Sequence, residues 1–215
     1  VPLLAQMGER LDRLVLSHSD QDHVGGARAV LDMQPQVALW SSLPLDHPLT
    51  QGREATACAA GQSWQWDGVR FEVLHPLAGD DALQGKSNAH SCVLRIDAAS
   101  GSVLLAGDIE AAQERDLLQR GIQPVDVLLV PHHGSKTSST QAFIEALQPR
   151  LALVQAGYRN RFGHPAPEVV ARYRGLQVPV LDSAHCGALQ WQSRSPESWR
   201  CEREQQRRYW HHSPP

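Results

Sequence analysis

Four side chains of the types that bind metal ions lie within six residues near the start of the chain, in Ser17-His18-Ser19-Asp20-Gln21-Asp22-His23. They follow a stretch that predicts a buried strand (14–17) and precede one that predicts a helix (24–33). A tight turn between the two can aim alternating side chains into one cavity, and imidazoles and carboxylates are ligands of Zn²⁺, Mn²⁺ and Fe²⁺. A polar loop with an ordinary helix cap is the alternative. Four such groups in this register favour a metal site.

Two more polar groups directly follow predicted strands later in the chain. Gly107-Asp108 comes after the apolar residues 103–106, and Pro131-His132-His133-Gly134 comes after 125–130. Polar groups at strand ends can meet at one edge of stacked sheets. We therefore expect both groups to join the first cluster.

These segments, in this order, resemble the metallo-β-lactamase superfamily. The HxHxDH signature of that superfamily reads HxDxDH here, with Asp20 in place of the second histidine. More closely, the chain from about Leu3 to Trp210 resembles the C-terminal domain of ComEC-type competence proteins, which are bacterial membrane channels for transforming DNA. The segments that carry this resemblance are SHSDQDHVGG, SNAHSCVLRI, LLAGDIE, VDVLLVPHHGSKTSS and NRFGHP.

The resemblance implies one or two divalent ions and a role for each ligand group. His18 and Asp20 would hold one metal, and Asp108 would bridge to the other. The second metal would be held by Asp22, His23 and one of His132 and His133, a choice that the sequence leaves open. The first metal lacks a clear third histidine, for which His90 is the candidate and nearby Asn88 a further neighbour. An oxygen-rich first site favours Mn²⁺ or Mg²⁺ over Zn²⁺.

The same resemblance implies catalytic and substrate-binding residues. The expected catalytic residues are Asp22, Asp108, His133 and His164. Asp22 would orient the attacking water, and whichever of the two consecutive histidines is not a ligand would donate a proton or contact a phosphate. Ser135 and Lys136 precede a predicted helix and could cradle a phosphate or simply cap that helix. Asn160 and His164 belong to the NRFGHP segment, which would line the site.

The predicted elements indicate an α+β fold, a metallo-β-lactamase-like αβ/βα sandwich. Strands are expected at 36–40, 63–66, 69–74, 92–96, 151–155 and 178–181, in addition to those named above, and helices at 3–9, 110–120, 140–147 and 167–173. Asp67-Gly68 between two apolar segments predicts a hairpin, and Gly121 is expected to end the helix at 110–120. Residues 41–62 are expected to be irregular. The superfamily's first strands are absent, so we expect a sandwich without its N-terminal strands and with an exposed sheet edge. Residues 1–192 are expected to form this hydrolase domain and 193–215 an arginine-rich extension.

Composition excludes several classes of protein. The net charge is −3, which argues against a strongly basic protein that coats DNA. No apolar run approaches the length of about 18 residues that crosses a bilayer. The four cysteines form no CxxC pair, which excludes a zinc finger or a thioredoxin-like motif and leaves disulfides open.

The leading functional hypothesis is a metal-dependent nuclease domain of a DNA-uptake channel that degrades the non-imported strand. The resemblance implies that its partners are DNA and the channel portion of the full-length protein, with this domain on the periplasmic side of the inner membrane. Two alternatives remain. The same fold could hydrolyse a small phosphorylated or acyl substrate, or it could bind DNA without catalysis.

Overall fold

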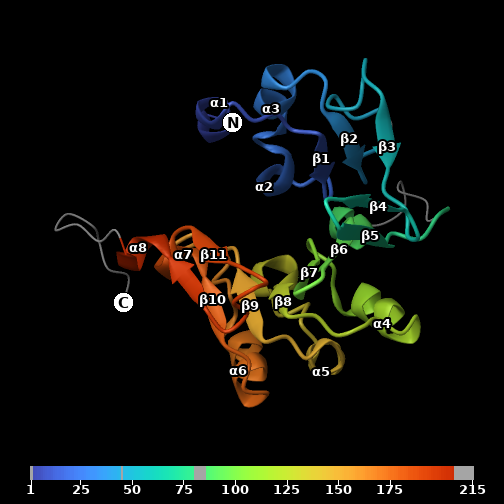
Figure 1. Cartoon of the computed structure of the whole chain (residues 1–215). Helices are drawn as coiled ribbons and strands as arrows, with labels where there is room; N and C mark the ends of the chain where they lie inside the picture. Colours follow the sequence, from blue (N-terminus) through green and yellow to red (C-terminus); the bar gives the residue numbers. More distant parts are fainter. Residues whose placement is uncertain (1, 45, 80–85, 206–215) are drawn as a thin grey trace.

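The computed structural model describes residues 2–44, 46–79 and 86–205, and two main sheets organise them (Figure 1). The small sheet has three parallel strands, β1 (Arg13–Leu16), β2 (Ala38–Ser41) and β3 (Ala55–Ala57), in that order. Among the described residues β1 pairs with β2 alone, so β1 forms an edge of this sheet.

Seven strands form the large sheet, in the order β10-β9-β8-β7-β6-β5-β4. They are β4 (Ser63–Trp66), β5 (Val69–His75), β6 (Val93–Ala98), β7 (Gly101–Leu105), β8 (Val127–Leu129), β9 (Leu151–Val154) and β10 (Val180–Asp182). Strands β4 to β7 are antiparallel, whereas β7 to β10 are parallel. The predicted Asp67-Gly68 hairpin is confirmed, and both of its residues have the positive φ that a tight hairpin turn requires.

Helices cover the outer faces, so that the layers run helix, sheet, sheet, helix (Figure 1). The N-terminal helices are α1 (Pro2–Met7), α2 (Gln21–Val24) and α3 (Ala27–Met33), and those on the large sheet are α4 (Ala111–Gln119), α5 (Gln141–Leu147) and α6 (Pro167–Gly175). Leu31 of α3 packs with Leu39 of β2, while Phe143 and Tyr173 pack on the large sheet. The predicted sandwich is confirmed. No helix in the described ranges has the length and apolar character needed to span a membrane.

A third apolar cluster fills the space between the two sheets. Trp40 of the small sheet packs here with Val73 and Leu94 of the large sheet. The disulfide Cys58–Cys92 belongs to the same cluster and joins the segment after β3 to the start of β6. The core and this covalent link together hold the sheets against each other, and both sheets supply residues to the site described below.

The structure corrects two expectations around the small sheet. The helix expected at 24–33 is two helices, because the chain breaks the helix at Gly25-Gly26, and the first of them already begins at Gln21. Residues 41–62 were expected to be irregular, yet β3 lies within them. Its three residues are too few to show an alternating pattern, and it exists because β2 offers a parallel edge to pair with.

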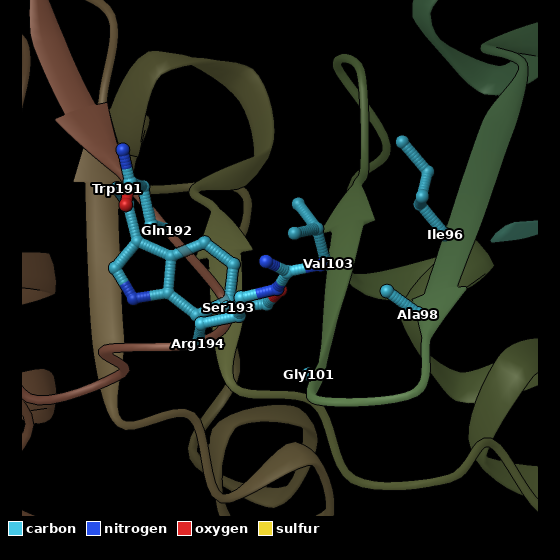
Figure 2. Close-up of a pocket in the computed structure, with 8 residues that line it drawn as sticks. All are labelled: Ile96, Ala98, Gly101, Val103, Trp191, Gln192, Ser193 and Arg194. Carbon is cyan, nitrogen blue, oxygen red and sulfur yellow. The ribbon is translucent and has the colours of Figure 1, made fainter. Parts of the chain in front are cut away.

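The C-terminal segment is tied to the domain by a small hairpin and a disulfide. Strands β11 (Leu189–Trp191) and β12 (Trp199–Cys201) pair antiparallel between the short helices α7 (Ser183–Cys186) and α8 (Glu202–Gln205), and Cys186 is bonded to Cys201. Trp191 and the residues after it face β7 across a shallow pocket (Figure 2). The expected boundary after residue 192 falls inside this hairpin. Residues 206–215 of the expected extension lie outside the described residues.

Removing the inter-sheet disulfide should destabilise the protein without changing its fold. The double variant Cys58→Ala/Cys92→Ala frees a link across 34 residues of sequence, which is expected to lower the free energy of unfolding by about 2–4 kcal/mol. Denaturant unfolding measures the change, with Cys186→Ala/Cys201→Ala as the matched pair outside the inter-sheet core. Unchanged stability, or four reactive thiols in the native protein, would contradict this description.

Candidate metal centre

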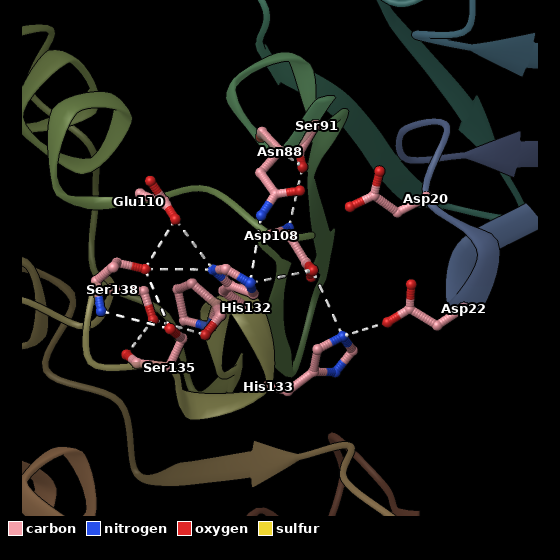
Figure 3. Close-up of polar contacts among 12 residues, drawn as sticks. Asp20, Asp22, Asn88, Ser91, Asp108, Glu110, His132, His133, Ser135 and Ser138 are labelled. Carbon is pink, nitrogen blue, oxygen red and sulfur yellow. Dashed lines mark hydrogen bonds and ion pairs between the residues drawn. The ribbon is translucent and has the colours of Figure 1, made fainter. Parts of the chain in front are cut away.

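The predicted ligands from three distant segments meet beside the ends of β1, β7 and β8 (Figure 3). Asp22 and His23 lie in α2, Asp108 follows β7, and His133 lies in the turn after β8. One ligand atom from each of the four lies within 4.8 Å of those of the other three. Two imidazoles and two carboxylates at this spacing form a donor set suited to a divalent transition metal.

Asp108 is the residue that the others share. Its Oδ1 lies 3.2 Å from Nε2 of His23, and its Oδ2 lies 3.4 Å from Nε2 of His133. Nε2 of His133 also lies 3.0 Å from Oδ2 of Asp22. Both oxygens of Asp108 are therefore engaged from different sides, which is the arrangement that the expected bridging role requires.

Charge compensation explains how this carboxylate can be buried. Asp108 is 4% exposed. Burial alone would raise its pKa, but the hydrogen bonds from His133 and His23 hold the pKa well below its usual value. The hydrogen bond to Asp108 in turn raises the pKa of His133 to about 9, against the opposing effect of burial. A positive charge next to Asp108, from an imidazolium or a metal ion, therefore stabilises this buried carboxylate.

His18 provides the test of whether a metal fits. It is fully buried, and its Nε2 has no hydrogen-bond partner. That atom lies 3.7 Å from Oδ2 of Asp20 and 3.8 Å from Oδ2 of Asp108. Burial lowers the pKa of His18, which keeps the imidazole neutral. Because orphaned buried nitrogens are rare, a neutral imidazole aimed at two carboxylates fits a metal ligand.

Ser91 favours the tautomer of His18 that carries its proton on Nδ1. Its hydroxyl donates to the carbonyl of Asn88 (2.9 Å) and accepts the backbone N–H of Asp108 (3.0 Å). Nδ1 of His18 lies between two hydroxyls, 3.2 Å from Oγ of Ser17 and 3.3 Å from Oγ of Ser91. Since the proton of Ser91 is already used, Ser91 can only accept from Nδ1–H, which leaves the lone pair on Nε2.

The two consecutive histidines have different surroundings. Nδ1–H of His133 donates to the carbonyl of Gln155 (2.7 Å), so Nε2 is the nitrogen that faces the cluster, where a bound metal would take the place of its proton. His132 instead lies with Nδ1 3.3 Å from Oε1 of Glu110 and Nε2 3.2 Å from Nδ2 of Asn88. His133 is therefore the better ligand of the pair, because a backbone carbonyl typically orients a metal-binding imidazole in this way.

A strained turn sends these side chains in different directions. His132 and His133 both have positive φ, 48° and 54°. Such a backbone costs about 1–3 kcal/mol for each residue with a β-carbon, and it is typical of functional sites. Gly134 continues the turn with φ 79°, and a Cβ there would meet that of Pro165 at 2.7 Å. A Cβ on Gly107, just before Asp108, would clash with Ser17 and Ser91.

The remaining predicted site residues are placed as follows. His90 ends a short turn and is not part of the four-residue cluster, whereas Asn88 reaches His132. Lys136 pairs with Glu168 at 3.1 Å, and its side chain is 73% exposed. Oγ of Ser135 lies 3.1 Å from Oγ1 of Thr137.

His164 lines a pocket that also contains Asp22 and His133, which places it beside the cluster. Asn160 holds the loop around it, because Oδ1 accepts the N–H of His164 (2.9 Å) and Nδ2 donates to the His164 carbonyl (2.6 Å). Burial and the nearby His132 and His133 lower the pKa of His164. Through its two hydrogen bonds to the His164 backbone, the side chain of Asn160 positions this loop.

Two residues at the site, Ser91 and Glu110, were not predicted from the sequence. Ser91 is fully buried and contacts His18 and Asp108, while Glu110 contacts His132. The signal for Glu110 was its position two residues after Asp108, in the GDIE segment. Ser91 had no signal of its own, since a serine before a strand is ordinary.

The model of the metallo-beta-lactamase superfamily matches residues 2–158. The chain belongs to the metallo-beta-lactamase superfamily. A solved structure from Parabacteroides distasonis, named as a metal-dependent hydrolase, superposes with a TM-score of 0.53 at 12% identity, over 81% of this chain and 77% of its own. At that identity the likeness concerns the fold alone.

Two curated relatives are named for recombination or competence. The chain is 38% identical over 194 residues to "Competence protein ComA" of Neisseria gonorrhoeae, covering 89% of this chain and 27% of the relative. It is 34% identical over 195 residues to "Recombination protein 2" of Haemophilus influenzae, covering 88% and 23%. The chain thus spans about a quarter of the length of these relatives.

Removing the Ser91 hydroxyl should weaken metal binding. In Ser91→Ala, Nδ1 of His18 loses one of its two hydroxyl neighbours, the one that can only accept, and the Asp108 N–H loses its partner. The expected loss of Mn²⁺ affinity is about 10- to 100-fold, as for other groups that orient metal ligands. Calorimetric titration measures it, with circular dichroism to confirm folding. Ser139→Ala is the control, because Ser139 is equally buried but contacts Tyr173. Equal affinity in both variants would refute the role of Ser91.

Proposed function

We propose that this chain is a metal-dependent phosphodiesterase that degrades DNA, the nuclease domain of a DNA-uptake protein. The main support for this proposal is the position of the Asp108 carboxylate. It lies between the imidazoles of His23 and His133 on one side and Nε2 of His18, which has no hydrogen-bond partner, on the other. Such an arrangement supports two neighbouring divalent ions, as used for in-line displacement at phosphorus. The similarity to proteins named for competence and recombination supports DNA as the substrate.

The proposed ligands divide into two groups around Asp108. His18 and Asp20 form one group, and Asp22, His23 and His133 form the other. Three carboxylates and three imidazoles make a set that accommodates Mn²⁺ as well as Zn²⁺. Divalent ions bound there supply a water activated at neutral pH and stabilise the oxygens of a phosphodiester.

Two residues then act on the reacting oxygens. The side chain of Asp22 is 61% exposed, so its carboxylate can bind a metal ion through one oxygen and accept a hydrogen bond from the attacking water through the other. His132 is the proposed proton donor to the leaving oxygen once its Nε2 carries a proton. Glu110 orients the ring through Nδ1, and Nε2, which accepts from Asn88 in this structure, lies 4.0 Å from Asp108.

The proposed setting is the periplasmic side of an inner-membrane channel, where the domain would degrade the strand that is not imported. Both described disulfides support an oxidising compartment, since such bonds persist there and are rare in the cytosol. The relatives are about four times as long as this chain, so the channel would lie in the remaining length. A metal-independent binding module accounts poorly for the buried Nε2 of His18.

Neutralising either key carboxylate should abolish cleavage of DNA. Asp108→Asn and Asp22→Asn are expected to lower the rate of cleavage with Mn²⁺ by at least about 100-fold. Asp108→Asn removes the carboxylate shared by the metal ligands, and Asp22→Asn removes the acceptor for the attacking water. Degradation of a labelled oligonucleotide, with EDTA and with Mn²⁺, Mg²⁺ or Zn²⁺, measures the effect. Asp32→Asn on the exposed side of α3 is the matched control.

The outcomes separate the candidate functions. Cleavage that survives EDTA or Asp108→Asn would contradict the proposed site. A metal-loaded protein that leaves all DNA intact would instead favour hydrolysis of a small phosphorylated or acyl substrate.

A further inference from the structure

The loop from Gly157 to His164 forms one wall of an open pocket beside the metal cluster. The pocket has a volume of about 410 Å³ and a largely apolar lining. Asp22 and His133 close the side next to the cluster, and Phe162 and His164 stand on the loop side. A group in this pocket would therefore lie next to the reacting phosphate.

Phe162 is exposed in a way that packing does not explain. Its exposed fraction is 66%, and it belongs to none of the three apolar clusters of the described residues. Its ring is nearly parallel to that of His164, with an angle of 16° and centroids 5.7 Å apart. The side chain of Asn160 is hydrogen-bonded to the backbone N–H and carbonyl of His164, which fixes the main chain of the loop next to Phe162.

Two arginines on the same loop each lie over an aromatic ring of the loop. The guanidinium of Arg161 lies 4.7 Å from the centroid of Phe162, and that of Arg159 lies 5.3 Å from the centroid of Tyr158. Aromatic faces next to arginines are the common means of holding an unpaired nucleotide, because the ring stacks on the base and the cation contacts the phosphate. The loop thus has an aromatic ring that can stack on a base and a guanidinium that can contact a phosphate.

We propose that Phe162 is a stacking platform for the base next to the scissile phosphate, with Arg161 as a phosphate contact, so that the preferred substrate is single-stranded DNA or a frayed end. This inference rests on the proposed nuclease function. A base inside a duplex is stacked on both faces and cannot offer one to Phe162. Cleavage of an intact duplex would first require unstacking.

The test compares Phe162→Leu, which keeps an apolar side chain but removes the aromatic face, with Phe162→Trp, which keeps that face. On a single-stranded oligonucleotide, Phe162→Leu is expected to lower kcat/KM by about 5- to 150-fold, the range for losing one stacked base. Phe162→Trp should retain the wild-type value. On an oligonucleotide with abasic sites, all three proteins should be equally slow. Trp199→Leu is the control for an aromatic residue 37% exposed outside the site.

Binding of a fluorescent oligothymidine in EDTA gives a second readout that does not need cleavage. Weaker binding by Phe162→Leu than by Phe162→Trp would support the platform. Equal cleavage and binding by the wild type and Phe162→Leu, or equal losses on normal and abasic DNA, would overturn it and leave the nuclease proposal intact. A wild-type protein that neither binds nor cleaves DNA would overturn both.

Discussion

A carboxylate that is 96% shielded from water must be neutralised by its surroundings, and Asp108 meets this need with imidazoles from α2 and from the turn after β8. Much of the local structure serves that contact. Gly107 lets the backbone pass close to Ser17 and Ser91, and the strained backbone of His133 brings its Nε2 to the carboxylate. The inter-sheet core and the Cys58–Cys92 link hold the contributing segments together.

Much of the fold was predictable because its elements have local signals. The Asp67-Gly68 hairpin and the helix that stops at Gly121 were both expected from turn and cap residues, and both are present. The strand β3 was missed because three residues carry no pattern, and its existence depends on the neighbouring β2. The disulfide pairing was likewise inaccessible, since four scattered cysteines do not indicate which two lie on facing sheets.

The candidate site was predictable in its ligand types and less so in its geometry. The HxDxDH segment and Asp108 could be predicted as ligands from their residue types and their position after apolar strands. Which of His132 and His133 faces the cluster depends on the positive φ angles of both residues, and no sequence pattern predicts these angles. The same holds for Ser91 and Glu110, whose importance comes from the groups that the fold brings to them.

We propose that Asp108 is the shared ligand of bound divalent ions. Anomalous diffraction from crystals grown with Mn²⁺ can decide whether it is. We predict one manganese peak bound by Asp108, His23 and His133, and a second ion that engages the Nε2 of His18 on the other side of Asp108. Manganese bound elsewhere on the chain, with Asp108 still in contact with the two histidines alone, would show that Asp108 is not a metal ligand.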